Sequence, residues 1–173
     1  MVGRDNLRFT VRITRYTDYS LRVLLFVALK DTQISTIGEI ANAYGISKNH
    51  LRKVVHELSL KGYLTASRGK NGGMYLKGRP EDINVGVLVR DLEADLELVE
   101  CFGDSNSCVL TPVCELKNAF HHALQAFFDC LEKYTLADLL PSNNQPEMIR
   151  LLDLAPLDIP QVKEVRPVQR RSV

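Results

Sequence analysis

Two short helical segments separated by a tight turn constrain this chain most. Residues 36–44 open with a capping box, Thr36-Ile-Gly-Glu39, in which each of the two polar side chains accepts a hydrogen bond from the other residue's backbone N–H. Gly45 is suited to end this helix, because glycine readily adopts the left-handed conformation found at helix C-termini. Ser47 is suited to cap a second helix that runs to about residue 61. The pattern predicts a helix-turn-helix.

The second helix is predicted to have an apolar and a basic face. Its apolar residues recur every three or four positions and should form one buried stripe: Leu51, Val54, Val55 and Leu58. The opposite face is polar or basic: Lys48, Asn49, Arg52, Lys53 and His56. A basic face on the second helix of such a pair is typical of a recognition helix that enters the major groove of DNA.

A β-hairpin is predicted next, with strands at 63–67 and 74–77 and a turn-rich, basic tip at 68–73. A helix-turn-helix followed by such a hairpin describes a winged helix, in which the wing contacts phosphates or the minor groove. We therefore expect a mainly α fold with a small β wing, and double-stranded DNA as a partner. The alternative is a small helical domain with a solvated hairpin.

Charge divides the chain into unlike halves. Residues 1–90 hold 15 Lys and Arg against 7 Asp and Glu, whereas residues 91–173 hold 7 against 14. A basic first half favours contact with a polyanion. The sequence has no apolar run of membrane-spanning length and no signal peptide, so we expect a cytoplasmic protein without a membrane partner, whose thiols stay reduced.

Three cysteines, Cys101, Cys108 and Cys114, lie in one turn-rich stretch with the spacing C-x6-C-x5-C. Thiolates are preferred ligands of soft metals and iron–sulfur clusters, so the stretch predicts a metal centre. Zinc is the main competitor, but structural zinc sites usually gather four local ligands, and the neighbouring sequence offers no fourth Cys or His. The other alternative is that these are ordinary surface cysteines.

A long amphipathic helix is expected after the third cysteine. Its apolar stripe is long for a small domain to bury alone, which favours a homodimer interface; the alternative is packing within one chain. The stripe comprises Leu116, Ala119, Phe120, Ala123, Leu124, Phe127, Phe128, Leu131 and Tyr134. We interpret Cys130, on the same helix, as a packing residue. Further helices are expected at about 16–30 and 83–93.

These features divide the chain into four parts. We expect an extension at 1–10, a winged helix-turn-helix DNA-binding domain at 11–80, and a cysteine loop with a dimerisation helix at 81–140. The remainder, 141–173, is expected to be a partly disordered tail, because its last part is rich in proline and charge and has no apolar period.

Four motifs in this order resemble the NsrR-type nitric-oxide-sensing repressors, a branch of the winged-helix iron–sulfur regulators that includes IscR and RirA. The motifs are Tyr16-Thr-Asp18-Tyr-Ser-Leu-Arg22, Gly45-Ile-Ser47-Lys-Asn49-His50-Leu51, Arg68-Gly-Lys70-Asn-Gly-Gly73 and the cysteine triplet. The resemblance covers about residues 11–152. Such proteins usually begin at the position of Val11, so residues 1–10 are interpreted as an added extension.

The resemblance implies a homodimer with one iron–sulfur cluster per subunit, held by Cys101, Cys108 and Cys114. A 4Fe–4S cluster is expected, with 2Fe–2S as the alternative. In some members an aspartate of the partner's first helix completes the ligand set, and Asp18 occupies that place. IscR-type proteins instead use a histidine three residues after the third cysteine, where this chain has Lys117.

The resemblance also implies DNA contacts by the recognition helix and the wing. The implied positions are Ser47, Asn49, His50 and Arg52 on the helix and Arg68 and Lys70 on the wing, and Lys48 and Lys53 complete the basic face. The expected function is a repressor that leaves its operator when nitric oxide reacts with the cluster. A sensor of redox state or iron status with the same fold is the alternative.

An enzyme is not expected. The cysteine spacing lacks the C-x-x-C pair of thioredoxin-like motifs. The sequence shows no Ser-His-Asp set, phosphate loop or paired catalytic carboxylates.

Overall fold

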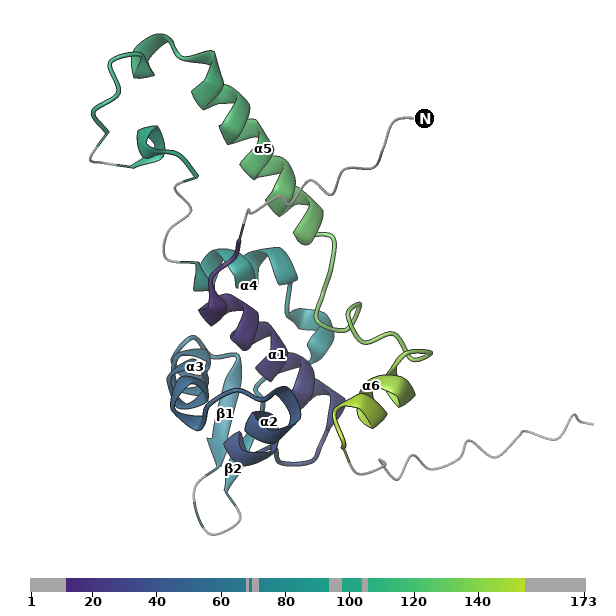
Figure 1. The fold of residues 1–173 in the computed structure, drawn as a ribbon. Helices are drawn as coiled ribbons and strands as arrows, with labels where there is room; N and C mark the ends of the chain where they lie inside the picture. The colour runs from purple at the N-terminus through teal and green to yellow at the C-terminus, as the bar shows by residue number, and fades with distance from the viewer. Residues whose placement is uncertain (1–11, 68, 70–71, 94–97, 104–105, 155–173) are drawn as a thin grey trace, which may run out of the picture.

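The structure is a computed structural model, and it describes residues 12–67, 69, 72–93, 98–103 and 106–154. A compact body of helices and a two-stranded sheet carries one long helix that projects away from it (Figure 1). The elements in order are α1 (Arg15–Leu29), α2 (Ile37–Tyr44), α3 (Lys48–Leu60), β1 (Leu64–Ser67), β2 (Gly73–Leu76), α4 (Val85–Leu92), α5 (Glu115–Leu131) and α6 (Gln145–Leu151). Short 3-10 turns lie at Pro80–Asp82, Glu100–Phe102 and Thr111–Val113.

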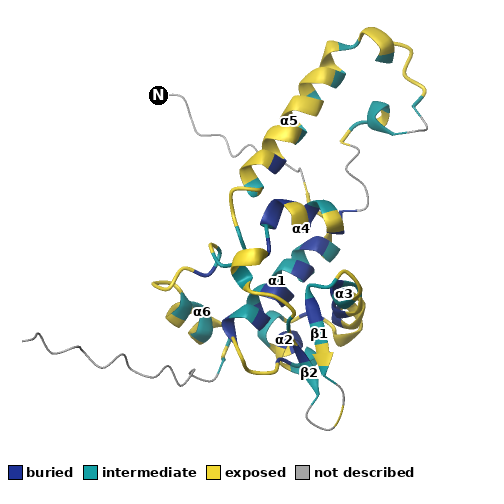
Figure 2. Ribbon diagram, turned by 180° about the vertical axis from the view of Figure 1, so that it is seen from behind, coloured by how far each residue is buried: buried dark blue, intermediate teal, exposed yellow. Residues whose placement is uncertain are grey.

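Helix α1 forms the centre of the core. Thr14 caps it, because the threonine hydroxyl accepts a hydrogen bond from the Thr17 N–H at 3.2 Å. Its buried side chains pack against α2, α3 and the sheet: Val23, Leu24, Phe26 and Val27. Figure 2 shows this helix as largely buried beneath its neighbours. All other elements of the body are therefore positioned relative to α1.

The predicted helix-turn-helix is confirmed in detail. Both hydrogen bonds of the capping box form at the start of α2, and Gly45 ends that helix in the left-handed conformation with φ of 65°. The Ser47 hydroxyl accepts a hydrogen bond from the His50 N–H at 3.3 Å and so caps α3. The predicted apolar stripe of α3 is buried.

The wing is also confirmed as an antiparallel pair, with Leu64 opposite Leu76 and Ser67 opposite Gly73. A bridge between Ser35 and Met74 extends the sheet to the segment that joins α1 and α2. Gly73 lies so close to the Ser35 carbonyl oxygen that no side chain would fit there. The wing is thus fixed to the helix-turn-helix at its base.

Helix α4 joins the body to α5 through a small apolar cluster of Val85, Val89 and Phe128. The Arg90 guanidinium lies 3.8 Å from the centroid of the Phe128 ring, and its Nη2 atom lies 3.1 Å from the Glu132 carboxylate. These contacts hold the C-terminal end of α5 on the body, and its N-terminal end lies far from it (Figure 1).

The predicted tail contains a helix that the sequence did not suggest. Helix α6 lies against the body, and Leu152 and Leu154 after it pack against the core that α1 and α2 share. The expected disorder at the end of the tail and the extension at 1–10 lie outside the described residues. Among the described helices, none is long and apolar enough to cross a membrane.

Candidate nucleic-acid interface and cysteine loop

The polar face of α3 is open to solvent, as a DNA-reading helix requires. All the positions predicted for DNA contact on and before this helix are exposed: Ser47, Lys48, Asn49, His50, Arg52 and Lys53. The two wing positions predicted for DNA contact, Arg68 and Lys70, lie outside the described residues. The α3 face therefore presents cationic and amide side chains on a helix whose other side is buried in the core.

Neighbouring side chains orient two of these α3 residues. The Arg52 Nη1 atom donates a hydrogen bond to the Asn49 Oδ1 atom at 2.6 Å, which holds the guanidinium along the helix. The His50 ring lies 6.3 Å from the Tyr19 ring of α1. His50 is therefore one point at which α1 lies beside the exposed face of α3.

The cysteine loop is held by polar contacts on both sides of its second cysteine. The Ser107 N–H and hydroxyl both donate to the Glu100 carboxylate, at 3.1 and 2.6 Å, and these hydrogen bonds lower the pKa of Glu100. The Asn106 Oδ1 atom accepts a hydrogen bond from the Cys108 N–H at 3.0 Å, while its Nδ2 atom donates to the Thr111 hydroxyl at 2.9 Å. These contacts order the loop around Cys108.

All three loop thiols are free. Cys108 is exposed, whereas Cys101 and Cys114 are half-buried. Cys114 is at the N-cap position of α5, and its own side chain makes no capping hydrogen bond with the first turn. Unpaired N–H groups at a helix N-terminus stabilise a thiolate, and they also favour a negatively charged group bound beside it.

The described residues do not include a group of three or more His, Cys, Asp or Glu side chains arranged to hold a metal ion. The single chain therefore does not bring the predicted ligands together. The donor chemistry nevertheless fits an iron–sulfur cluster, because three unpaired thiols lie on one loop and one of them stands at the N-cap position of a helix.

Asp18 lies on α1, away from the loop of its own chain (Figure 1). The Arg22 guanidinium binds its carboxylate with two contacts, Nε to Oδ1 at 3.1 Å and Nη2 to Oδ2 at 2.8 Å. The same guanidinium lies 5.9 Å from the Tyr19 ring centroid and 5.8 Å from that of Tyr44, the last residue of α2. Asp18 is thus linked through Arg22 to the helix-turn-helix.

Most of the predicted dimerisation stripe on α5 is uncovered in the single chain (Figure 2). Only Phe128 of the stripe is buried, while the exposed fractions reach 64% at Leu116 and 90% at Val109 in the neighbouring loop. Cys130, which we expected to pack, is exposed in this chain. The apolar surface runs from the cysteine loop along the helix.

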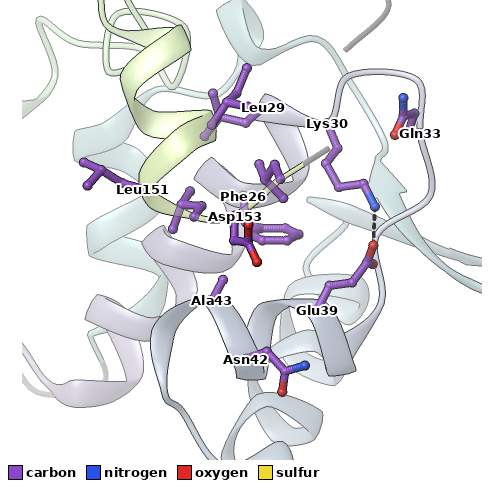
Figure 3. Close-up of a pocket in the computed structure, with 12 residues that line it drawn as sticks. Phe26, Leu29, Lys30, Gln33, Glu39, Asn42, Ala43, Leu151 and Asp153 are labelled. Carbon is purple, nitrogen blue, oxygen red and sulfur yellow. Dashed lines mark hydrogen bonds and ion pairs between the residues drawn. The ribbon is translucent and has the colours of Figure 1, made fainter. Parts of the chain in front are cut away.

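A pocket of about 430 Å³ between α1, α2 and the end of α6 was not predicted from the sequence. Figure 3 shows Lys30 at its edge, where the buried ammonium donates to the Glu39 carboxylate at 2.7 Å and to the Ile34 carbonyl oxygen at 2.9 Å. The pocket contains none of the predicted cysteine or DNA-binding residues. The Lys30 ammonium is thus bound by two groups of the chain itself, and its ion pair with Glu39 joins the end of α1 to α2.

Comparison with known proteins gives matches over the part of the chain that holds the helix-turn-helix and the cysteine loop. Residues 13–142 match the model of the Rrf2 family, described as an iron-dependent transcriptional regulator. The HTH-type transcriptional regulator NsrR of Geobacillus kaustophilus is 52% identical over 132 residues, which cover 75% of this chain and 90% of the relative. NsrR of Bacillus licheniformis is 48% identical over 144 residues, covering 82% and 99%.

Solved structures support the fold. The structure of IscR from T. potens superposes with a TM-score of 0.64 at 22% identity, covering 80% of this chain and 93% of that one. The predicted fold class, mainly α with a winged helix-turn-helix, is confirmed. The expectation that the chain is not an enzyme is confirmed as well, because its relatives are named as transcriptional regulators.

Proposed function

This chain belongs to the Rrf2 family of transcriptional regulators and resembles NsrR proteins over most of its length, and from this premise we propose that it is an iron–sulfur-dependent repressor. It would bind operator DNA as a cytoplasmic homodimer and leave the DNA when nitric oxide reacts with the cluster. The observation that carries the proposal is a loop of three free thiols that follows, after the wing and α4, a helix-turn-helix whose basic face is exposed.

DNA contact is assigned to the exposed face of α3. Arg52 would donate to a guanine edge and Asn49 would bind an adenine, while Lys48 and Lys53 would contact phosphates. Ser47 already caps the helix, so it would contribute mainly through its helix N-terminus, where a phosphate is favoured. Arg68 and Lys70 of the wing would add phosphate or minor-groove contacts.

Cluster binding is assigned to Cys101, Cys108 and Cys114 of one subunit, with Asp18 supplied by the other. When bound, a 4Fe–4S cluster with one carboxylate ligand would supply an iron that is open to a small molecule such as nitric oxide. The N–H groups in the first turn of α5, beside Cys114, would favour the negative charge of a bound cluster. The exposed apolar surface of α5 would pack against its copy and bring the two subunits together.

The Asp18 carboxylate could bind either Arg22 of its own chain or the cluster of the partner subunit. Exchange between these two partners would transmit the state of the cluster to the helix-turn-helix. In the single chain its carboxylate is bound by Arg22, which also stacks on Tyr19 and Tyr44. A carboxylate used as a ligand would leave Arg22 at least in part, and a released carboxylate would return to it. Because Tyr44 precedes the turn before α3, this exchange would shift the recognition helix.

The proposal is tested by anaerobic purification with iron and sulfide analysis. We expect a brown protein with about four irons per chain. Titration with nitric oxide should release a bound duplex, with a change in Kd of roughly a hundredfold, equivalent to about 3 kcal/mol. Equal affinity of the metal-loaded and metal-free protein for this duplex would refute the proposal, as would colourless protein that contains only zinc.

Asp18→Ala separates the role of the aspartate from that of the thiols. This variant should keep its cluster, because three thiolates remain, but its response to nitric oxide should weaken. An unchanged release from DNA would exclude Asp18 from the mechanism. Oxygen and a chelator, tested in the same titration, separate nitric oxide sensing from a sensor of redox state or iron status.

A further inference from the structure

The last turn of α4 contains a buried carboxylate that no predicted site uses. Glu93 has only 8% of its surface exposed, and its Oε1 atom accepts two hydrogen bonds from Thr14, from the N–H at 2.8 Å and from the hydroxyl at 3.3 Å. Thr14 is the cap of α1, and its carbonyl oxygen accepts the Asp18 N–H at 3.1 Å. Glu93 therefore binds the residue from which α1 begins.

The same turn of α4 also binds the wing. The Tyr63 hydroxyl, just before β1, donates to the Asp91 carboxylate at 2.6 Å. Burial of the phenol, together with the hydrogen bond and the negative charge of Asp91, raises the pKa of Tyr63 well above its usual value, so the hydroxyl stays protonated as a donor. Two carboxylates at the end of α4 thus hold α1 and the wing.

Glu93 is close in sequence to the cysteine loop, so its contact with α1 can respond to a movement of that loop. Seven residues separate it from Cys101, the first cysteine of the loop, and α4 ends at Leu92. A displacement of the cysteine loop would therefore reach the body first at Glu93. At the other side of the contact, Thr14 starts the helix whose Tyr19 ring touches His50 on α3.

We propose that Glu93 is a positioning residue through which each subunit's own cysteine loop sets the position of α1, and through α1 the recognition helix. This inference rests on the proposed function and adds a route within one subunit to the exchange of Asp18 between subunits. A partly broken contact would leave the buried Glu93 carboxylate short of hydrogen-bond donors. Such a state has a high free energy, because a buried charge without partners is strongly disfavoured. The contact is either formed or broken, as a two-state coupling requires.

Glu93→Ala tests this role, with the affinity ratio of cluster-loaded and metal-free protein as the readout. The probe is a duplex selected from a random-sequence pool by the cluster-loaded wild-type protein. We expect a wild-type ratio on the order of 10- to 100-fold and a ratio below about threefold in Glu93→Ala, with iron content unchanged. Glu93→Gln keeps an acceptor oxygen and should restore most of the wild-type ratio.

Asp138→Ala is the matched control. The Asp138 carboxylate accepts the Thr135 N–H and hydroxyl, both at 2.8 Å, so its donors match those of Glu93, but this carboxylate is exposed and lies between α5 and α6. Its affinity ratio should equal the wild-type ratio. If Glu93→Ala does not fold, Thr14→Val carries the test, because it removes the hydroxyl donor from the other side of the same contact.

The outcomes separate this inference from the proposed function. A wild-type ratio near one would refute the proposed function itself. A large ratio in wild type that persists in Glu93→Ala would refute only the role of Glu93. Loss of iron from Glu93→Ala would also overturn that role, because Glu93 would then belong to the metal site.

Discussion

Gly86→Ala is expected to separate α4 from α5, and the structure gives the size of the effect. A Cβ atom built on Gly86 would lie 2.7 Å from the Glu132 backbone nitrogen and 3.0 Å from its Cα atom. Real Cβ atoms do not approach backbone this closely, and backbone atoms cannot rotate away as a side chain can. The end of α5 would have to move away from α4.

Overpacking of this kind costs about 1–3 kcal/mol, and contact with backbone favours the upper part of that range. Replacing a helical glycine by alanine recovers up to about 1 kcal/mol. The net loss of stability should be about 1–2 kcal/mol, which corresponds to a fall in Tm of about 3–8 °C for a chain of this size. Thermal unfolding followed by circular dichroism measures it.

Gly38→Ala is the matched control, because Gly38 also lies within a helix but its Cβ would meet only the Thr36 Oγ1 atom, at 3.7 Å. This variant should gain about 0.5–1 kcal/mol of stability. The two substitutions are thus expected to shift Tm in opposite directions. Equal shifts in the same direction would refute the close approach of α4 and α5.

Three further results are expected. Arg52→Ala should weaken binding to a selected duplex by about 1–3 kcal/mol in a mobility-shift titration, with a much smaller effect on random DNA, and equal losses on both would contradict base contact. Cys108→Ser should lower iron and sulfide content sharply, whereas the same change at Cys130 should leave both unaffected. Partial burial raises the pKa of Glu39, but hydrogen bonds from Lys30 and Thr36 outweigh it and hold the pKa below its usual value. Stability from this carboxylate is therefore complete above the unfolded pKa and is lost as pH falls through the lower folded pKa, so acid should reduce the urea midpoint of wild type more than that of Glu39→Gln.

Local chemistry made the DNA-binding half predictable. The capping box at Thr36, the left-handed Gly45 and the cap at Ser47 each act within four residues, so the sequence alone locates the helix ends. The period of the apolar residues on α3 then determines which face is buried and which is exposed. Both predictions are confirmed by the structure.

Contacts between distant residues could not be predicted in this way. Nothing near Glu93 in the sequence indicates Thr14, which lies 79 positions away. Helix α6 is short, with three apolar residues (Met148, Ile149 and Leu151) in about two turns, and it depends on packing against the body. The cysteine ligands remain a prediction, because the described residues do not bring three such ligands together.

The return of the chain to the body has a mechanical consequence. The segment that carries the cysteines leaves the body at the end of α4 and returns to the same helix, because Val85 and Val89 of α4 pack against Phe128 near the end of α5. Both ends of this segment are therefore attached to the same helical body. Under the proposed function, a displacement at the thiols would therefore reach the helix-turn-helix through both attachments.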